Sequence, residues 1–91
     1  MSKLVSRVKV KNALGLHARP ATLIVKLLQG FKSSVTFTYK KETINARSIM
    51  SILILAIRKN TQLTIAVEGE DAEETMESLV QVFENQFGEI N

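Results

Sequence analysis

Residues 62–83 read QLTIAVEGEDAEETMESLVQVF, and their hydrophobic period changes halfway along the run. The first part alternates, with Leu63, Ile65 and Val67 on one side, which predicts a strand over residues 62–68 that buries one face. The second part places apolar residues three or four positions apart, which is the spacing of a helix packed on one side. The run therefore predicts a strand that is followed closely by a helix.

The predicted final helix has the clearest signals in the chain. Asp71 stands where a capping residue is expected, and Glu74 follows three positions later, as in a capping box. The apolar positions form one stripe, which consists of Ala72, Met76, Leu79 and Phe83. Residues 88–91 lie beyond this stripe, and we expect them to form a frayed tail.

The rest of the chain continues the same two periods. Strands are predicted over residues 4–11, 34–39 and 42–45, one helix between Pro20 near its start and Gly30 with a positive φ at its end, and a short helix over residues 49–57. The turn at Lys40 and Lys41 lacks the Asn-Gly of a tight hairpin, so its conformation stays open. The order β-α-β-β-α-β-α with half-polar strands predicts an α+β fold class. We expect a two-layer open-faced sandwich, in which three helices cover one face of a four-stranded antiparallel sheet.

Length and composition limit the class of protein. The 91 residues fit a single domain, 1–91, and without cysteine the chain can form neither a disulfide nor a thiolate metal site. The most apolar stretch, residues 52–57, is far shorter than the roughly 20 residues of a membrane-spanning helix, and residues 1–5 are unlike a signal peptide. A cytoplasmic protein without membrane insertion is therefore expected.

The formal charge is divided sharply along the chain. Residues 1–59 hold all 12 Lys and Arg with one acid, Glu42, whereas residues 60–91 hold the other eight acids. The two parts therefore carry +11 and −8, within a net charge of +3. Such a division suggests a basic face for an acidic partner or a phosphate, and simple solubilisation of two faces is the alternative.

The only histidine lies directly before a predicted helix, in the segment Gly15-Leu16-His17-Ala18-Arg19-Pro20-Ala21. Because Pro20 has no N–H, the free donors of the first turn are those of Ala18 and Arg19, which can point at an anion. Arg19 adds a guanidinium that binds phosphate oxygens, and Gly15 permits the turn that presents the ring. The pattern favours His17 as a nucleophile for a phosphoryl group, and an ordinary surface or capping histidine is the alternative.

This segment resembles the active-site signature of the HPr family, the histidine phosphocarriers of the phosphoenolpyruvate-dependent sugar phosphotransferase system. A second segment, Ile44-Asn45-Ala46-Arg47-Ser48-Ile49-Met50, is similar to the regulatory serine segment of that family. The spacing of the two segments, the length and the element order match as well. The resemblance implies a carrier rather than an enzyme. His17 would be phosphorylated on Nδ1 by phosphorylated enzyme I and would donate the group to enzyme IIA domains, while Arg19 would stabilise it.

The resemblance also implies regulation and docking. Ser48 would be modified by the ATP-dependent HPr kinase/phosphorylase, and partner proteins would dock on Lys26, Arg47, Ile49, Met50 and Leu53. A monomer without cofactor or metal ion is expected. From its position alone, Ser48 is a plausible cap of the short helix, where an added phosphate would meet free N–H groups. A purely structural cap remains the alternative for Ser48, and a core position remains the alternative for Met50.

The chain departs from the common family pattern in four places. These are Ala13-Leu14 before the glycine, Lys40-Lys41 in a turn, Ser51 after Met50, and Asn60 at a common glycine position. Asn60 is expected to tolerate a left-handed conformation. None of the four affects His17, Arg19 or Ser48, so they bear on the choice of partners rather than on the carrier role.

Three other functions are alternatives to this one. A carrier of the parallel nitrogen-type phosphotransferase branch would share the same site. A small RNA-binding domain would suit the basic residues 1–59, but only Phe37 and Tyr39 are aromatic on a predicted strand, which is too few to stack bases. Metal-dependent or triad catalysis lacks suitable residues, since the chain has one histidine and no cysteine.

Overall fold

The computed structural model describes residues 2–89 and contains the expected order of strands and helices. The strands are β1 (Ser2–Lys9), β2 (Ser34–Tyr39), β3 (Glu42–Asn45) and β4 (Gln62–Gly69). The α-helices are α1 (Ala18–Leu28), α2 (Ile49–Leu55) and α3 (Ala72–Glu84). A short 3₁₀-helix, η1 (Gln86–Gly88), follows α3 and is absent from the sequence-based prediction. Within residues 2–89, no helix is long and apolar enough to cross a membrane.

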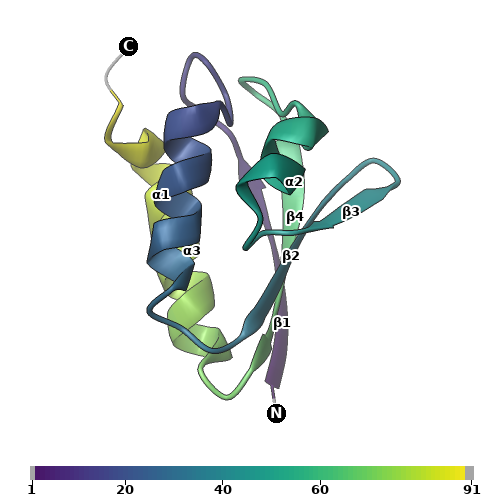
Figure 1. Ribbon diagram of the computed structural model, residues 1–91, viewed down its shortest axis with the longest axis vertical. Helices are drawn as coiled ribbons and strands as arrows, with labels where there is room; N and C mark the ends of the chain where they lie inside the picture. The colour runs from purple at the N-terminus through teal and green to yellow at the C-terminus, as the bar shows by residue number, and fades with distance from the viewer. Residues whose placement is uncertain (1, 90–91) are drawn as a thin grey trace.

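The four strands form one antiparallel sheet in the order β1-β4-β2-β3. Val8 of β1 lies opposite Leu63 of β4, and Phe37 of β2 lies opposite Ile65. All four side chains are buried, because the helices pack on this face of the sheet (Figure 1). The predicted α+β open-faced sandwich is therefore confirmed.

An aromatic cluster ties the chain beyond α3 to the core. The ring of Phe83 contacts Phe37 at a centroid distance of 5.9 Å and Phe87 at 4.9 Å, both edge to face. Phe87 is buried although its backbone has a φ of 57° inside η1. The predicted frayed tail is therefore wrong up to Glu89, because a buried phenylalanine holds the chain against the domain; residues 90–91 lie outside the described residues.

Asp71 occupies the predicted N-cap position of α3, but its side chain does not cap the helix. Its carboxylate instead accepts hydrogen bonds from the backbone N–H groups of Lys32 and Ser33, at 2.8 and 2.9 Å, and from the hydroxyl of Ser33. The predicted capping box is thus wrong, because the loop before β2 supplies better donors. These bonds hold the pKa of Asp71 at about 2, the hydroxyl of Ser33 having the largest effect.

Turn residues fulfil the sequence expectations only in part. Asn60 has a φ of 70°, as predicted for an asparagine at a common glycine position. Gly30 does not adopt the predicted positive φ, because α1 ends on Gln29 in a right-handed conformation whose N–H still bonds to the last turn. The hairpin between β2 and β3 turns at Lys40 with a φ of 57°, which gives this turn its left-handed residue without glycine or asparagine.

Candidate functional site

The loop before α1 approaches the end of α2 so closely that it requires glycine at position 15. Gly15 has a φ of +67°, and a Cβ atom built on it would lie 2.2 Å from the carbonyl oxygen of Ile57. The next residue, Leu16, is buried and donates its N–H to that same oxygen at 3.0 Å. The loop is therefore held by backbone contacts, and the position of His17 follows from them.

His17 is the N-cap residue of α1. Its carbonyl accepts the N–H of Ala21 at 3.1 Å, whereas the imidazole makes no side-chain cap bond. The side chain is 31% exposed. The N–H groups of Ala18 and Arg19 lie in the first turn, where a helix offers no acceptor of its own. His17 thus lies directly before the helix, as the sequence predicted, at an end where the helix dipole favours negative charge.

Glu89 binds the imidazole of His17 at Nε2, and the sequence did not predict this contact. Its Oε2 atom lies 2.8 Å from Nε2 of His17, and its Oε1 accepts a hydrogen bond of 2.8 Å from Nδ2 of Asn12. Asn12 is fully buried and also donates to the carbonyl of Gly15 at 2.7 Å. The only sequence signal was Phe87, an apolar residue beyond the predicted helix, which the structure buries against Phe83.

The carboxyl group of Glu89 is 13% exposed and ionises more readily than usual. Burial by itself opposes ionisation. The hydrogen bonds from Asn12 and His17, with the electrostatic attraction of His17 and Arg19, outweigh burial and hold the pKa of Glu89 below its ordinary value. The ring of His17 therefore faces a carboxylate at Nε2, while Nδ1 is the other nitrogen of the ring.

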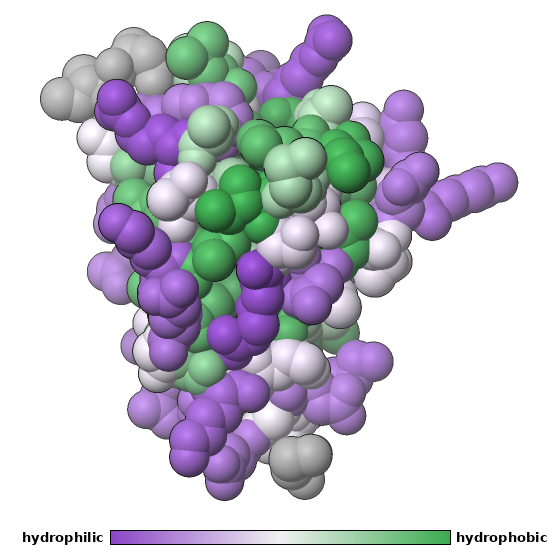
Figure 2. All heavy atoms as spheres, viewed as in Figure 1, coloured by the Kyte–Doolittle hydropathy of each residue, from purple (hydrophilic) through white to green (hydrophobic). Residues whose placement is uncertain are grey.

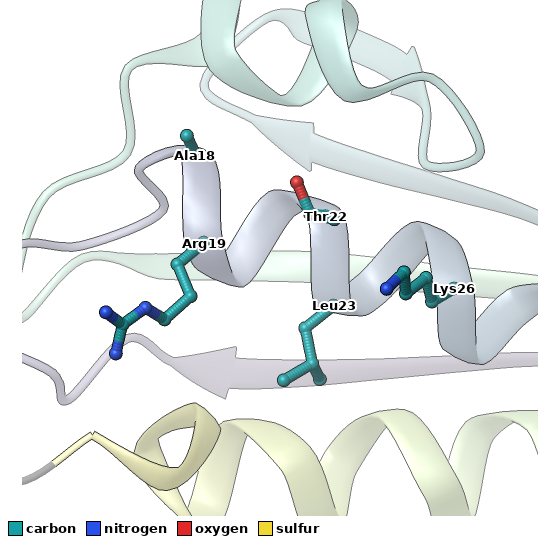
Figure 3. Close-up of a pocket in the computed structure, with 5 residues that line it drawn as sticks. All are labelled: Ala18, Arg19, Thr22, Leu23 and Lys26. Carbon is teal, nitrogen blue, oxygen red and sulfur yellow. The ribbon is translucent and has the colours of Figure 1, made fainter.

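An exposed groove runs along α1, and Arg19 lines one end of it (Figure 3). The groove has a volume of about 410 Å³ and is lined by Ala18, Arg19, Thr22, Leu23 and Lys26. Arg19 and Leu23 project from the same side of the helix, and Lys26 lies further along it (Figure 3). Both cations of this surface thus belong to α1, and Arg19 stands at the end nearer His17.

The exposed hydrophobic side chains only partly match the predicted docking residues. Met50 is 67% exposed, but Ile49 and Leu53 are half-buried and pack against the core. Two residues missed in the sequence are more exposed, namely Leu14 at 74% and Ile54 at 70%. Hydrophobic side chains gather over α2 and the adjoining part of α1 in Figure 2. Ile54 could have been found from its spacing, because it lies one helical turn after Met50.

Arg47 has a structural role that its sequence position did not reveal. Its guanidinium donates to the carbonyl oxygens of Leu28, Phe31 and Ser33, at 2.8, 2.8 and 2.7 Å. Three of its five N–H donors are therefore used within the domain. Arg47 joins the end of α1 to the following loop, which leaves it less free for docking than Lys26, an exposed residue.

Ser48 is the N-cap residue of α2, as predicted. Its Oγ accepts a hydrogen bond of 3.2 Å from the N–H of Ser51, and its own N–H donates to the carbonyl of Asn45. The residue is half-buried. Its hydroxyl thus already faces the first turn of a helix that leads to the exposed Met50. Elsewhere in residues 2–89, no group of three or more His, Cys, Asp and Glu side chains is placed to hold a metal ion.

Comparison with known proteins gives one family. A profile described as "PTS HPr component phosphorylation site" matches residues 5–85. The phosphocarrier protein HPr of Chlamydia muridarum is 44% identical over 81 residues, which cover 89% of this chain and 78% of the relative. The crystal structure of Thermoanaerobacter tengcongensis HPr superposes with a TM-score of 0.89 at 35% identity and covers both chains fully. That of Bacillus anthracis HPr gives 0.83 at 40% identity, covering 89% of this chain and 96% of the other. The chain therefore belongs to the HPr family of phosphocarrier proteins of the phosphotransferase system.

Proposed function

We propose that His17 accepts a phosphoryl group from phosphorylated enzyme I and passes it to enzyme IIA domains of the sugar phosphotransferase system. One observation carries the proposal: the partly exposed imidazole lies at the open N-terminus of α1, beside Arg19. The lone pair of Nδ1 attacks phosphorus, the bond from phosphorus to the donor breaks, and its electron pair stays on the donor. The protein is a substrate of this relay and returns to its starting state when the group leaves.

The first turn of α1 supplies the groups that hold the phosphate. The N–H groups of Ala18 and Arg19 and the positive end of the helix dipole favour negative charge at this point. The exposed guanidinium of Arg19 offers further donors to the phosphate oxygens. Because the group stays at the surface, the next acceptor can reach it.

Partner proteins are proposed to dock beside the histidine on an apolar surface. Met50 and Ile54 of α2 are exposed large hydrophobic residues, Ile49 and Leu53 of the same helix are half-buried, and Leu14 is an exposed one in the loop before α1. Lys26 and Arg19 add positive charge along α1, which suits an acidic partner. The carrier is proposed to work as a cytoplasmic monomer, since a self-association through this surface would cover the docking residues.

Incubation with phosphoenolpyruvate and enzyme I tests the carrier role. Mass spectrometry is expected to show one acid-labile phosphoryl group per chain, and His17→Ala is expected to abolish it because the acceptor nitrogen is gone. Arg19→Ala is expected to slow transfer without preventing it. A wild-type chain that stays unmodified by an active donor contradicts the proposal.

The type of enzyme I separates the two branches of the system. Sugar-type enzyme I is expected to phosphorylate the chain faster than nitrogen-type enzyme I when both are assayed at equal concentration. Equal rates, or no transfer from the sugar-type donor, would favour the nitrogen-type branch.

Ser48 is proposed to be a regulatory phosphorylation site for HPr kinase/phosphorylase. Support comes from its N-cap position, where an added phosphate meets first-turn N–H groups, and from the exposed Met50 two residues later. The added charge would repel an acidic partner at the docking surface. Kinase and ATP are expected to modify the wild type but not Ser48→Ala, and modification elsewhere in the chain would contradict the assignment.

A further inference from the structure

We infer that Glu89 is a positioning residue, which fixes the proton of the His17 ring on Nε2 and so keeps Nδ1 free as the nucleophile. This inference rests on the proposed carrier function. It assigns a task to Glu89, which lies within the predicted frayed tail of residues 88–91. The bond between Glu89 Oε2 and His17 Nε2 measures 2.8 Å and joins residues 72 positions apart.

A carboxylate can only accept hydrogen bonds, so a ring nitrogen that binds it carries the proton. A neutral imidazole has one proton to place, and once it is on Nε2 the lone pair of Nδ1 is available. During transfer this lone pair forms the bond to phosphorus while the Nε2 proton stays on the ring. The ring then carries positive charge, and the carboxylate of Glu89 lies against it. No proton has to leave the site.

Asn12 binds the second oxygen of the Glu89 carboxylate and so determines which hydrogen-bonding group faces position 89. Its Nδ2 donates both to Glu89 Oε1 at 2.8 Å and to the carbonyl of Gly15 at 2.7 Å. Because Asn12 is fully buried, this amide cannot turn out to solvent. Because the carbonyl of Gly15 can only accept a hydrogen bond, it keeps Nδ2, and not Oδ1, turned toward the side chain at position 89.

The orientation of Asn12 predicts an unusual order of variants. In Glu89→Gln, the amide oxygen would face Nδ2 of Asn12, which leaves the NH₂ group facing Nε2 of His17. That NH₂ donates to Nε2 and drives the ring proton to Nδ1, where it blocks the nucleophile. Glu89→Ala leaves the ring to water, so both tautomers coexist. The nearly isosteric glutamine should therefore impair the carrier more than alanine does.

The experiment measures the ring tautomer and the transfer rate in the same variants. Nitrogen NMR at alkaline pH, where imidazoles are neutral, is expected to show protonated Nε2 in the wild type, protonated Nδ1 in Glu89→Gln and a mixture in Glu89→Ala. The kcat/KM of phosphorylation by enzyme I is expected to fall about tenfold or more in Glu89→Gln, the scale of a hydrogen bond to a charged group. The loss in Glu89→Ala is expected to be smaller.

Glu84→Gln is the matched control, because Glu84 is an exposed carboxylate near the end of α3 that bonds to Lys11 and not to the histidine. Its tautomer and its rate are expected to equal those of the wild type. If Glu89→Gln is milder than Glu89→Ala, or if the wild-type ring is protonated on Nδ1, the inference is overturned while the carrier role stands. If enzyme I phosphorylates neither wild type nor variants, the carrier role fails, and the NMR result still decides whether Glu89 sets the tautomer.

Discussion

Asp71 is the N-cap residue of α3, and Glu89 follows the short η1 helix after α3; both side chains are carboxylates that accept hydrogen bonds from another part of the chain. Each carboxylate reaches a segment far away in the sequence, and each has a pKa below its ordinary value because of the donors it accepts. Asp71 binds the backbone of Lys32 and Ser33, which have no reactive group to offer. Glu89 binds the imidazole of His17. Asp71 thus joins the start of α3 to the loop before β2, whereas Glu89 joins the segment after η1 to the N-cap residue of α1.

The largest loss of stability is expected at Gly15, in the loop before α1 that approaches the end of α2. Gly15→Ala would place a Cβ atom 2.2 Å from the carbonyl oxygen of Ile57, at a φ that side chains rarely adopt. We expect the free energy of unfolding to fall on the order of 3 kcal/mol, measured by urea denaturation. Gly88→Ala is the control, since it also has a positive φ but meets no atom within 4 Å. Equal losses in both variants would mean that strain, and not the close approach, determines the cost.

Asp71→Asn is expected to separate stability from chemistry. The NH₂ group of asparagine would oppose the N–H of Lys32, which now donates to Oδ2. We expect the midpoint of thermal unfolding to drop by about 5–10 °C, while phosphorylation by enzyme I stays unchanged. Glu89→Gln should show the reverse, with a smaller shift of the midpoint and a slower transfer. Similar results for the two variants in both measurements would contradict this difference between Asp71 and Glu89.

Stability is expected to depend on pH through the Asp71 carboxylate. The pKa of Asp71 is lowered from 3.8 to about 2, so its ionised form stabilises the fold above pH 3.8, and this stabilisation is lost as the pH falls through about 2. Glu89 acts with the same sign, because its pKa is also lowered. A thermal series from pH 6 to about pH 2 is expected to show a smaller loss in Asp71→Asn than in the wild type. Parallel curves would show that other carboxylates dominate acid unfolding.

The smallest effect on stability is expected from a third carboxylate, that of Glu84, which is exposed and pairs with a residue far away in the sequence. Glu84 forms an ion pair of 2.9 Å with Lys11, 73 positions away, and both side chains are exposed. Glu84→Gln is expected to change the free energy of unfolding by less than about 1 kcal/mol, and salt should reduce the difference further. A loss as large as that of Asp71→Asn would show that the distance spanned in sequence, rather than the number of donors, sets the contribution.

The sequence predicted the features that depend on residues close together in the chain. It did not predict contacts between residues that only the folded structure brings together. Hydrophobic periods predicted the strands and helices, and the cap of α2 by Ser48 followed from a partner three residues away. The fate of the Asp71 carboxylate could not be read in this way, because its donors come from a loop 38 and 39 positions earlier. Glu89 was missed for the same reason. The position of His17 directly before a helix, with Arg19 in the first turn, could be predicted because a helix start is a local feature.

β1 is an outer strand of the sheet, and its composition has a consequence for the behaviour of many copies together. An outer strand offers backbone groups on which a further strand can assemble. The exposed positions of β1 include Lys3, Arg7 and Lys9, so two molecules aligned along this strand would bring like charges to about 5 Å from each other. The same cations that make this half of the chain basic therefore discourage fibre-like stacking at high concentration.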